Sequence, residues 1–296
     1  MAYVIGERCG DACFCGWMLV DGKILVEEMR GEMRFSVIIP VYNAAAFLPA
    51  CLDSVVGQSF SDWECLCVDD GSVDGSADIL DEYAIRDTRF RIMRQPHRGV
   101  GPARNVALGH AVGDYVVFVD ADDVLEPNAL LSLKDAEADI VTYLPLDGRW
   151  GISDTCLQLF DRCVGNLLAW NAAYRRETVG DIRFPDFPNF EDVVFATAVF
   201  CRSVQIASAP RWYDHRVRAG SAMDQYTWRR VAGNVKAGWM IHGLADDYIS
   251  RQVVWKRRIA MRIILIRKLL AHFVLHVAAY AVRAAIASMR GRGRGR

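Results

Sequence analysis

The chain has 296 residues, of which 52% are hydrophobic and 24% are charged, and this composition excludes disorder over most of its length. The formal net charge is −1, so no overall field draws the protein to nucleic acid, and we expect no nucleic-acid partner. The length suffices for one large domain with appendages.

Residues 1–32 carry neither a clean periodicity nor a motif, and we expect them to form an N-terminal appendage. The first strand-like segment begins directly after Met33. No basic segment followed by an apolar run opens the chain, so a signal peptide is not evident and we expect a cytoplasmic location. Cys9, Cys13 and Cys15 lie close together, but no second Cys or His pair stands at a zinc-like spacing, which favours reduced thiols.

From Phe35 onward, strand-like and helix-like segments alternate along the chain. The strand-like segments are short apolar runs, whereas the helix-like segments carry apolar residues at helical spacing. This order predicts an α/β fold with a parallel-rich mixed sheet flanked by helices. The expected strands are 35–40, 63–68, 90–94, 115–119 and 139–144, and the expected helices are 44–57, 76–86, 102–110, one after Pro127, and 193–202.

Polar residues follow the predicted strands at their carboxyl ends, where open α/β sheets bind ligands near a change in strand order. Pro40, Tyr42 and Asn43 end the first strand, and Asp69 and Asp70 end the second. An aspartate at a strand end can accept hydrogen bonds from ribose hydroxyls or from a base N–H. The alternative is a plain Asx turn that leads into the next helix.

The fourth expected strand ends in the acidic run Asp120-Ala121-Asp122-Asp123. Carboxylates two positions apart at a strand end can face one hard cation, and Mn²⁺ or Mg²⁺ prefers such oxygen ligands and shares its other positions with substrate phosphates. We therefore expect Asp120 and Asp122 to hold Mn²⁺ or Mg²⁺, with Ala121 beside the same ligand. The alternative is an acidic turn in which Asp123 or Glu126 begins the next helix.

The segment Gly99–Asn105, GVGPARN, matches part of a dinucleotide-binding glycine pattern, but Arg104 stands where the third glycine belongs. We interpret it as a loop that enters a helix, with Arg104 able to donate charge-assisted hydrogen bonds to a phosphate or a base. The alternative places Arg104 on a solvated helix face.

Five of these segments, in this order, resemble motifs of the glycosyltransferase family 2 enzymes: SVIIPVYN, VDDGSVDGS, GVGPARNVAL, FVDADD and NFEDVVF. The resemblance spans roughly Phe35 to Met223. It implies a GT-A type fold, a UDP-sugar or similar nucleotide-sugar donor, and inversion at the anomeric carbon. It places Asp69 and Asp70 at the base and ribose. The full set of expected donor-binding residues is Pro40, Tyr42, Asn43, Asp69, Asp70, Arg104, Asp120, Ala121 and Asp122.

The pair Glu191-Asp192 stands where this family keeps its catalytic base. An inverting transfer needs a base opposite the leaving group to take the proton of the acceptor hydroxyl, and we expect Asp192 to be that base. Two alternatives remain open: Glu191 is the base, or both residues only open the following helix through its dipole.

Residues 213–221, YDHRVRAGS, resemble the family's YR-x-x-x-GS segment near the donor phosphates. We therefore expect Arg216 and Ser221 to contact the donor. The family commonly has another aromatic residue where His215 stands, so the segment leaves open whether His215 or Arg216 touches the ligand.

These motifs define a catalytic domain at residues 33–223, with a nucleotide-sugar half to about residue 123 and an acceptor half after it. A helical C-terminal region follows at 224–296. Between Arg251 and Arg296 the chain has no acidic residue, and 255–289 carries basic and apolar residues on opposite helix faces. This pattern predicts a basic amphipathic helix on an anionic membrane surface. The alternative is a helix packed on the catalytic domain or on a second subunit.

The sequence as a whole predicts a metal-dependent inverting glycosyltransferase at the inner face of the cell membrane. We expect it to move a sugar from a UDP-sugar to a hydroxyl of a glycan or lipid-linked acceptor, in polysaccharide or lipid-linked glycan synthesis. One alternative is a nucleotidyltransferase, although such enzymes place a Gly-rich loop with a basic residue after the first strand. The other is a catalytically silent module that binds nucleotides or glycans.

Overall fold

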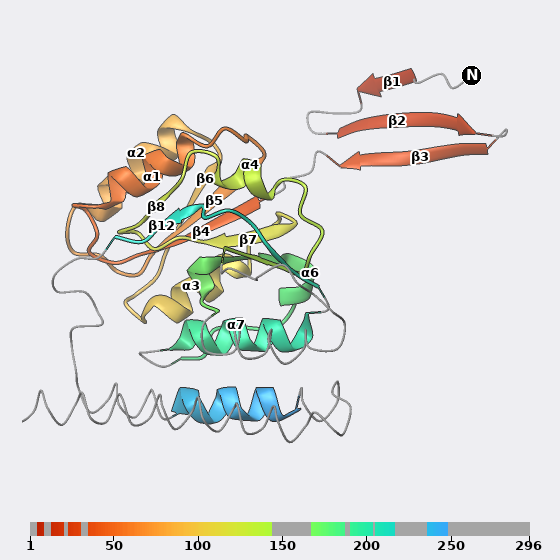
Figure 1. Cartoon of the computed structure of the whole chain (residues 1–296). Helices are drawn as coiled ribbons and strands as arrows, with labels where there is room; N and C mark the ends of the chain where they lie inside the picture. The colour runs from red at the N-terminus through yellow and green to blue at the C-terminus, as the bar shows by residue number, and fades with distance from the viewer. Residues whose placement is uncertain are drawn as a thin grey trace, which may run out of the picture.

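A seven-stranded sheet forms the centre of the protein (Figure 1). The computed structural model describes residues 5–8, 13–20, 23–30, 35–143, 167–186, 190–203, 205–216 and 236–247. The strands of the sheet are β4 (Phe35–Val41), β5 (Trp63–Asp69), β6 (Phe90–Arg94), β7 (Tyr115–Phe118), β9 (Ile140–Thr142), β10 (Ala172–Arg175) and β11 (Ile206–Ser208).

The strand order is β11-β9-β10-β7-β4-β5-β6, and most neighbours are parallel. β4 pairs in parallel with both β5 and β7, and β5 pairs in parallel with β6. Only β10 is antiparallel to its neighbours, β7 and β9. The predicted parallel-rich mixed sheet is therefore confirmed. β10 and β11 were not predicted, because four and three residues are too few to show a periodicity.

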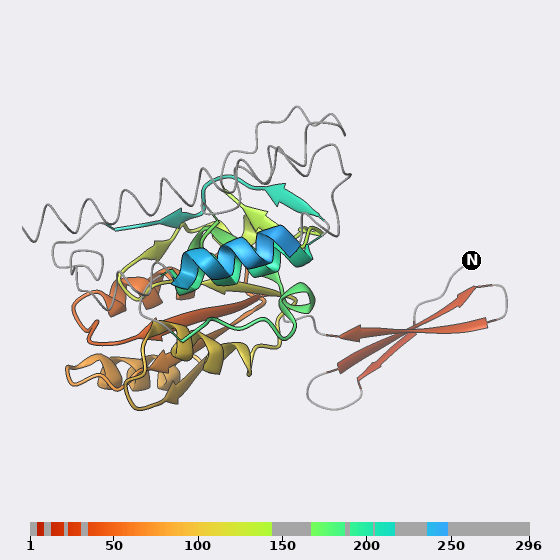
Figure 2. The same ribbon diagram turned by 90° about the horizontal axis from the view of Figure 1, so that it is seen from below.

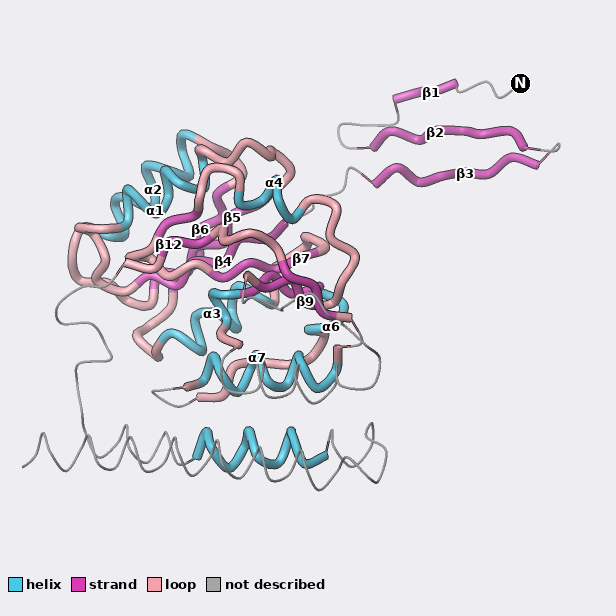
Figure 3. The backbone as a smooth tube through the Cα atoms, in the orientation of Figure 1, coloured by secondary structure: helices cyan, strands magenta, loops and turns pink. Residues whose placement is uncertain are grey.

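Helices cover both faces of this sheet (Figures 1, 2 and 3). Because both faces are covered, β4 and β5 are buried at every position, which explains their continuous apolar runs. On one face lie α1 (Leu48–Val56), α2 (Ser76–Arg86) and α4 (Ala129–Leu133), and on the other lie α3 (Val100–Leu108), α6 (Arg176–Val179) and α7 (Glu191–Arg202).

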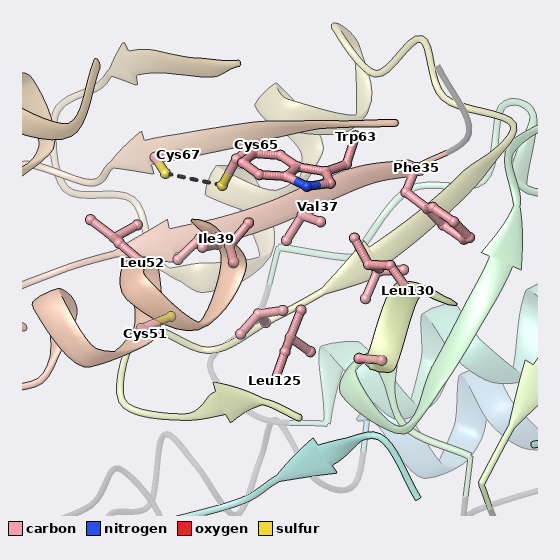
Figure 4. Close-up of a cluster of buried hydrophobic side chains, with 14 of the residues drawn as sticks. Phe35, Val37, Ile39, Cys51, Leu52, Trp63, Cys65, Cys67, Leu125 and Leu130 are labelled. Atoms are coloured by element: carbon pink, nitrogen blue, oxygen red, sulfur yellow. Dashed lines mark hydrogen bonds between the residues drawn. The ribbon is translucent and has the colours of Figure 1, made fainter. Parts of the chain in front are cut away.

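Alternate side chains of β4 enter the two cores. Val37 and Ile39 pack on the face of α1, where Cys51 and Leu52 meet them (Figure 4). Ile38 points to the opposite core. A further helix at 236–247 adds buried alanines and isoleucine to that second core, and Figure 1 shows it below α7.

Helix α1 begins at Leu48, four residues later than predicted. The backbone N–H of Ala44 donates to Ser76 Oγ at 2.9 Å, and that of Ala45 donates to Asp74 Oδ2 at 3.0 Å. Asp74, in the loop before α2, and Ser76, the first residue of α2, thus accept from amides that we had assigned to the helix. Pro49 in the first turn suits the later start.

Three smaller features complete the described chain. β8 (Val124–Leu125) pairs with β12 (Tyr213–Asp214), and the short helix η1 (Ala169–Asn171) precedes β10. Near the N-terminus, β1 (Ile5–Arg8), β2 (Cys13–Val20) and β3 (Lys23–Arg30) pair with one another and with no strand of the large sheet.

These N-terminal strands were not predicted, while the domain boundaries at 33 and 223 remain predictions. Among the residues that the structure describes, no helix is long and apolar enough to cross a membrane. The predicted amphipathic helix at 255–289 lies outside the described residues.

Candidate active site

The predicted donor-binding residues gather at the carboxyl edge of the sheet. The chain runs from β4 through β5 to β6 in one direction and then returns to place β7 on the other side of β4. This reversal of strand order is the position at which open α/β sheets bind ligands. Tyr42 and Asn43 follow β4, Asp69 ends β5, and Asp120 and Asp122 follow β7.

Asp70 is buried and holds the segment that leads into α3. Its Oδ1 accepts hydrogen bonds from Gln95 Nε2 at 2.6 Å and from the Arg98 N–H at 2.8 Å, and its Oδ2 accepts one from the Gly99 N–H at 2.8 Å. These contacts give Asp70 a structural role at the site. Its expected contact with base or ribose stays a prediction.

Asp69 is also buried and belongs to a turn that joins the loops after β4 and β5. Its Oδ1 accepts from the Ser72 N–H at 3.0 Å. Asn43 donates its backbone N–H to Ser72 Oγ at 3.0 Å and accepts from the Val73 N–H at 2.8 Å. Asn43 has φ of 48°, a left-handed conformation that asparagine tolerates better than most residues. The Asx turn that we kept as an alternative is formed by Asp74, whose Oδ1 accepts from the Ser76 N–H at 3.0 Å, two residues along the chain.

Arg104 connects the acidic run after β7 to the start of α7. Its guanidinium donates to Asp120 Oδ1 at 2.7 Å and to Glu191 Oε1 at 3.1 Å, and only 3% of the residue is exposed. Burial alone would lower its pKa, but Asp120, Glu191 and Asp192 outweigh burial and raise the pKa of Arg104. The alternative of a solvated helix face is wrong, because these carboxylates hold the side chain inside.

The two acidic residues in the first turn of α7 have raised pKa values. Burial, together with the repulsion of Asp192, raises the pKa of Glu191 to about 7, although Arg104 opposes this shift. Burial also raises the pKa of Asp192, and the positive charge of Arg104 again opposes the shift. Asp192 Oδ1 accepts from the N–H of Val193, one of the amides that a helix start leaves open. Both carboxylates are therefore more basic than ordinary ones.

Tyr213 ties Asp123 to the backbone of Asp120. Its hydroxyl donates to Asp123 Oδ2 at 2.6 Å and accepts from the Asp120 N–H at 3.1 Å. The N–H of Arg216 also donates to Asp123 Oδ1, at 2.7 Å. The interpretation of Asp123 or Glu126 as a helix start is wrong, because α4 begins after Asn128.

Tyr213 was not among the predicted functional residues, although it begins the YDHRVRAGS segment. Burial, with the charges of Asp120 and Asp123, raises its pKa, so that it stays a neutral donor. Of the two donor contacts expected in this segment, the backbone of Arg216 lies beside Asp123, and Ser221 lies outside the described residues.

Asp120 and Asp122 offer carboxylate oxygen, the ligand type that Mn²⁺ and Mg²⁺ prefer. The Asp120 side chain is 30% exposed and Asp122 is half-buried, so both are partly open to solvent. No group of three or more His, Cys, Asp and Glu side chains in the described part of the chain is arranged around one metal position. Two carboxylates suit a cation that takes its other ligands from water and substrate phosphates.

Of the other expected donor contacts, Tyr42 is exposed, whereas Pro40 and Ala121 are buried. Pro40 lies within β4, beside Val68 of β5. Ala121 packs into the core on the α1 face. Their contact with the donor stays a prediction.

The arrangement of sheet and helices defines the class as a GT-A fold, and comparison with solved structures agrees. Staphylococcus aureus TarS 1–349 in complex with UDP-GlcNAc superimposes with a TM-score of 0.63 and 22% identity, over 81% of this chain and 72% of TarS. The mannosyltransferase PcManGT from Pyrobaculum calidifontis, in complex with GDP-Man and Mn²⁺, gives 0.56 and 21%, over 88% of this chain and 79% of PcManGT.

Residues 36–141 match the family model of glycosyl transferase family 2. EpsH of Bacillus subtilis (strain 168) is 30% identical over 217 residues, which are 64% of this chain and 63% of EpsH. The chain therefore spans less than two thirds of this relative. Residues 36–141 are therefore similar to glycosyltransferase family 2, the family that the motifs resemble.

Proposed function

We propose that the protein is a metal-dependent inverting glycosyltransferase that moves a sugar from a UDP-sugar to an acceptor hydroxyl. The observation that carries this proposal is the bridge from Asp120 through Arg104 to Glu191. It joins the carboxylates suited to a metal–diphosphate with those suited to proton transfer. The complexes of TarS with UDP-GlcNAc and of PcManGT with GDP-Man and Mn²⁺ support a nucleotide-sugar donor and a divalent metal.

Asp192 is the better candidate for the base. Glu191 Oε1 is engaged by Arg104 and the residue is buried, whereas Asp192 is half-buried. The pKa of both carboxyls is raised, so exposure and the contact with Arg104 decide between them. In the transfer, the Asp192 carboxylate takes the acceptor hydroxyl proton as the oxygen attacks the anomeric carbon. The bond from that carbon to the diphosphate oxygen breaks on the opposite face, which inverts the configuration.

Asp120 and Asp122 are the residues that would hold the metal. A divalent cation held by them would supply positive charge to offset the negative charge on the departing nucleoside diphosphate. Tyr213 keeps the acidic run in place through Asp123 and the Asp120 amide.

The decisive experiment measures nucleotide release from UDP-, GDP- and dTDP-sugars, with Mn²⁺ and with Mg²⁺. We expect turnover with a UDP-sugar, and Asp192→Asn abolishes it while UDP binding, measured by calorimetry, persists. Glu191→Gln keeps an oxygen for Arg104 and is the matched control, with a smaller loss. Turnover that survives in Asp192→Asn would remove Asp192 as the base, and no turnover with any sugar would favour a silent binding module.

We also propose that the acceptor is a glycan or a lipid-linked sugar and that the protein works at the cytoplasmic face of the cell membrane. Support comes from the sequence of 255–289, whose basic and apolar residues would fall on opposite faces of a helix, and from the Arg-rich end that follows it. Deletion of 255–296 is expected to move the protein from the membrane fraction to the soluble fraction. An unchanged distribution would argue against the membrane contact.

A further inference from the structure

Two exposed rings stack at the carboxyl edge of the sheet. Tyr42 follows β4, and His97 lies in the segment that Asp70 holds; their ring centroids are 3.9 Å apart and their planes differ by 21°. Tyr42 is 46% exposed although His97 covers one of its faces. Its exposed area therefore belongs to the other face and the ring edge.

His97 is fixed from two directions. Its Nδ1 lies 2.8 Å from Asp70 Oδ2 and 3.2 Å from the Asp70 carbonyl oxygen, and since both are acceptors, Nδ1 carries the hydrogen. Its backbone also packs against the turn at Gly71, where an added Cβ would lie 2.9 Å from His97 N. The imidazole thus has one defined orientation even though 54% of its side chain is exposed.

We propose that His97 is a positioning residue that holds Tyr42 so that the open face of Tyr42 stacks on the nucleobase of the donor. This inference rests on the proposed function and extends it to a residue that the motifs did not identify. A planar base stacks on any aromatic face. An exposed tyrosine that is free to rotate loses side-chain entropy when a base binds, whereas a tyrosine already stacked on His97 loses less.

Because His97 acts through Tyr42 on binding and not on the reacting atoms, its loss changes affinity and leaves the chemical step intact. We expect His97→Ala to raise the Kd for UDP and the KM for the sugar donor about 5-fold, with kcat unchanged. In a Tyr42→Ala background, His97→Ala is expected to have no further effect, since the ring on which it acts is absent.

Calorimetric titration with UDP tests this with three variants and a control. His97→Phe keeps a ring against Tyr42 and is expected to retain near wild-type affinity, whereas His97→Gln keeps a hydrogen-bonding group without a ring and is expected to resemble His97→Ala. His110→Ala is the control, since the ring of that exposed histidine contacts only Val106 O among the described hydrogen bonds. Thermal unfolding of each variant separates loss of fold from loss of affinity.

The outcomes separate this inference from the proposed function. Equal UDP affinity in the wild type and His97→Ala overturns the inference alone, and so does a His97→Phe variant as weak as His97→Ala. A wild-type protein that binds neither UDP, GDP nor dTDP overturns the proposed function and this inference with it.

Discussion

Arg104 is the residue on which the charges of the site depend. Its guanidinium faces Asp120 and Glu191 directly, and the charge of the nearby Asp192 joins theirs in raising the pKa of Arg104 against the effect of burial. Three carboxylates around one cation leave an excess of negative charge. Burial raises the pKa of Glu191, and repulsion by Asp192 and Asp120 adds to the shift against the opposing charge of Arg104. A second cation at Asp120 and Asp122 would offset that excess, which fits the proposed metal position.

The pKa of Glu191, about 7 in the fold against an ordinary value of 4.5, makes the stability of the protein depend on pH. Protonated Glu191 stabilises the fold fully below the ordinary pKa, and this contribution is lost as pH rises through about 7. Glu191→Gln removes the dependence. We therefore expect the unfolding free energy of the variant, relative to wild type, to rise by about 2 to 3 kcal/mol from about pH 5 to about pH 8.

Chemical denaturation at several pH values measures this difference. Glu82→Gln, which removes an exposed carboxylate on α2 that pairs with Arg86, corrects for the change in formal charge. A difference between Glu191→Gln and wild type that stays flat across this range would contradict the raised pKa.

Two glycines in the loop after β5 differ in whether their surroundings leave room for a side chain. Gly71 has φ of 76°, and an added Cβ would lie 2.9 Å from His97 N, whereas the Cβ of an alanine at Gly75 would meet only Ala45 Cβ, at 3.9 Å. Gly71→Ala is expected to lower the unfolding free energy by about 1 to 3 kcal/mol, because the conformation and the contact both strain it. Gly75→Ala is expected to be near neutral. Thermal unfolding of the pair checks this, and equal stability would count against a strained turn at Gly71.

At the scale of elements, the pairing of β8 with β12 brings residues of the second half of the chain onto the acidic run. Tyr213 lies on β12, and its hydroxyl reaches both Asp123 and the Asp120 amide. Because Asp123 is buried, loss of the Tyr213 hydroxyl leaves the Asp123 carboxylate with one fewer hydrogen-bond donor. The strand pair therefore links the stability of the region to the placement of the proposed metal ligands.

Tyr213→Phe is expected to lower the unfolding free energy by about 1 to 3 kcal/mol and to weaken Mn²⁺ binding. Tyr174→Phe is the matched control: its buried hydroxyl donates to Leu168 O at 2.6 Å, away from the acidic run. It is expected to lower stability without changing Mn²⁺ affinity. Calorimetric titration with Mn²⁺ distinguishes the two, and equal affinities in both variants would remove Tyr213 from the support of the metal position.

The elements that the sequence predicted best are those whose burial dictates their composition. β4 and β5 lie between two layers of helices, so every position is apolar or bonded, and their ends could be located within one residue. β10 has the sequence Ala-Ala-Tyr-Arg, in which no β-branched residue marks a strand. The start of α1 was misplaced because Ala44 and Ala45 donate their backbone N–H groups to side chains about 30 residues away, at the start of α2, and not to the helix.

The site, too, depends on contacts between residues that are distant in the sequence. Asp69 and Asp120 stand at the carboxyl ends of two parallel strands. Because parallel strands end at the same edge of a sheet, the sequence was enough to predict that these two residues lie at one edge. The pairing of Arg104 with Glu191 joins residues 87 positions apart, and it depends on how α3 and α7 pack on the sheet. Local patterns carry no information on that packing, so burial of Arg104 was unexpected.

Across the whole molecule, the two edges of the sheet have different roles. At the amino edge, buried Glu64 accepts from Ser36 Oγ at 2.7 Å and from the Val112 N–H at 2.8 Å, and it pairs with Arg91 at 2.9 Å. These contacts join β4, β5 and β6 with the segment that enters β7. The carboxyl edge holds the proposed donor-binding residues, so stability and function should respond to different substitutions.

Glu64→Leu tests this separation, because it leaves Ser36 Oγ and the Val112 amide without their acceptor. We expect the unfolding free energy to fall by about 3 kcal/mol, while the folded protein keeps wild-type affinity for UDP. Asp122→Asn at the opposite edge is expected to do the reverse, with nearly unchanged unfolding and weaker binding of UDP in the presence of Mn²⁺. Denaturation and UDP titration on both variants decide the matter. If Glu64→Leu weakened UDP binding as much as Asp122→Asn does, the edges would be coupled, and the sheet could not be treated as a rigid support for the site.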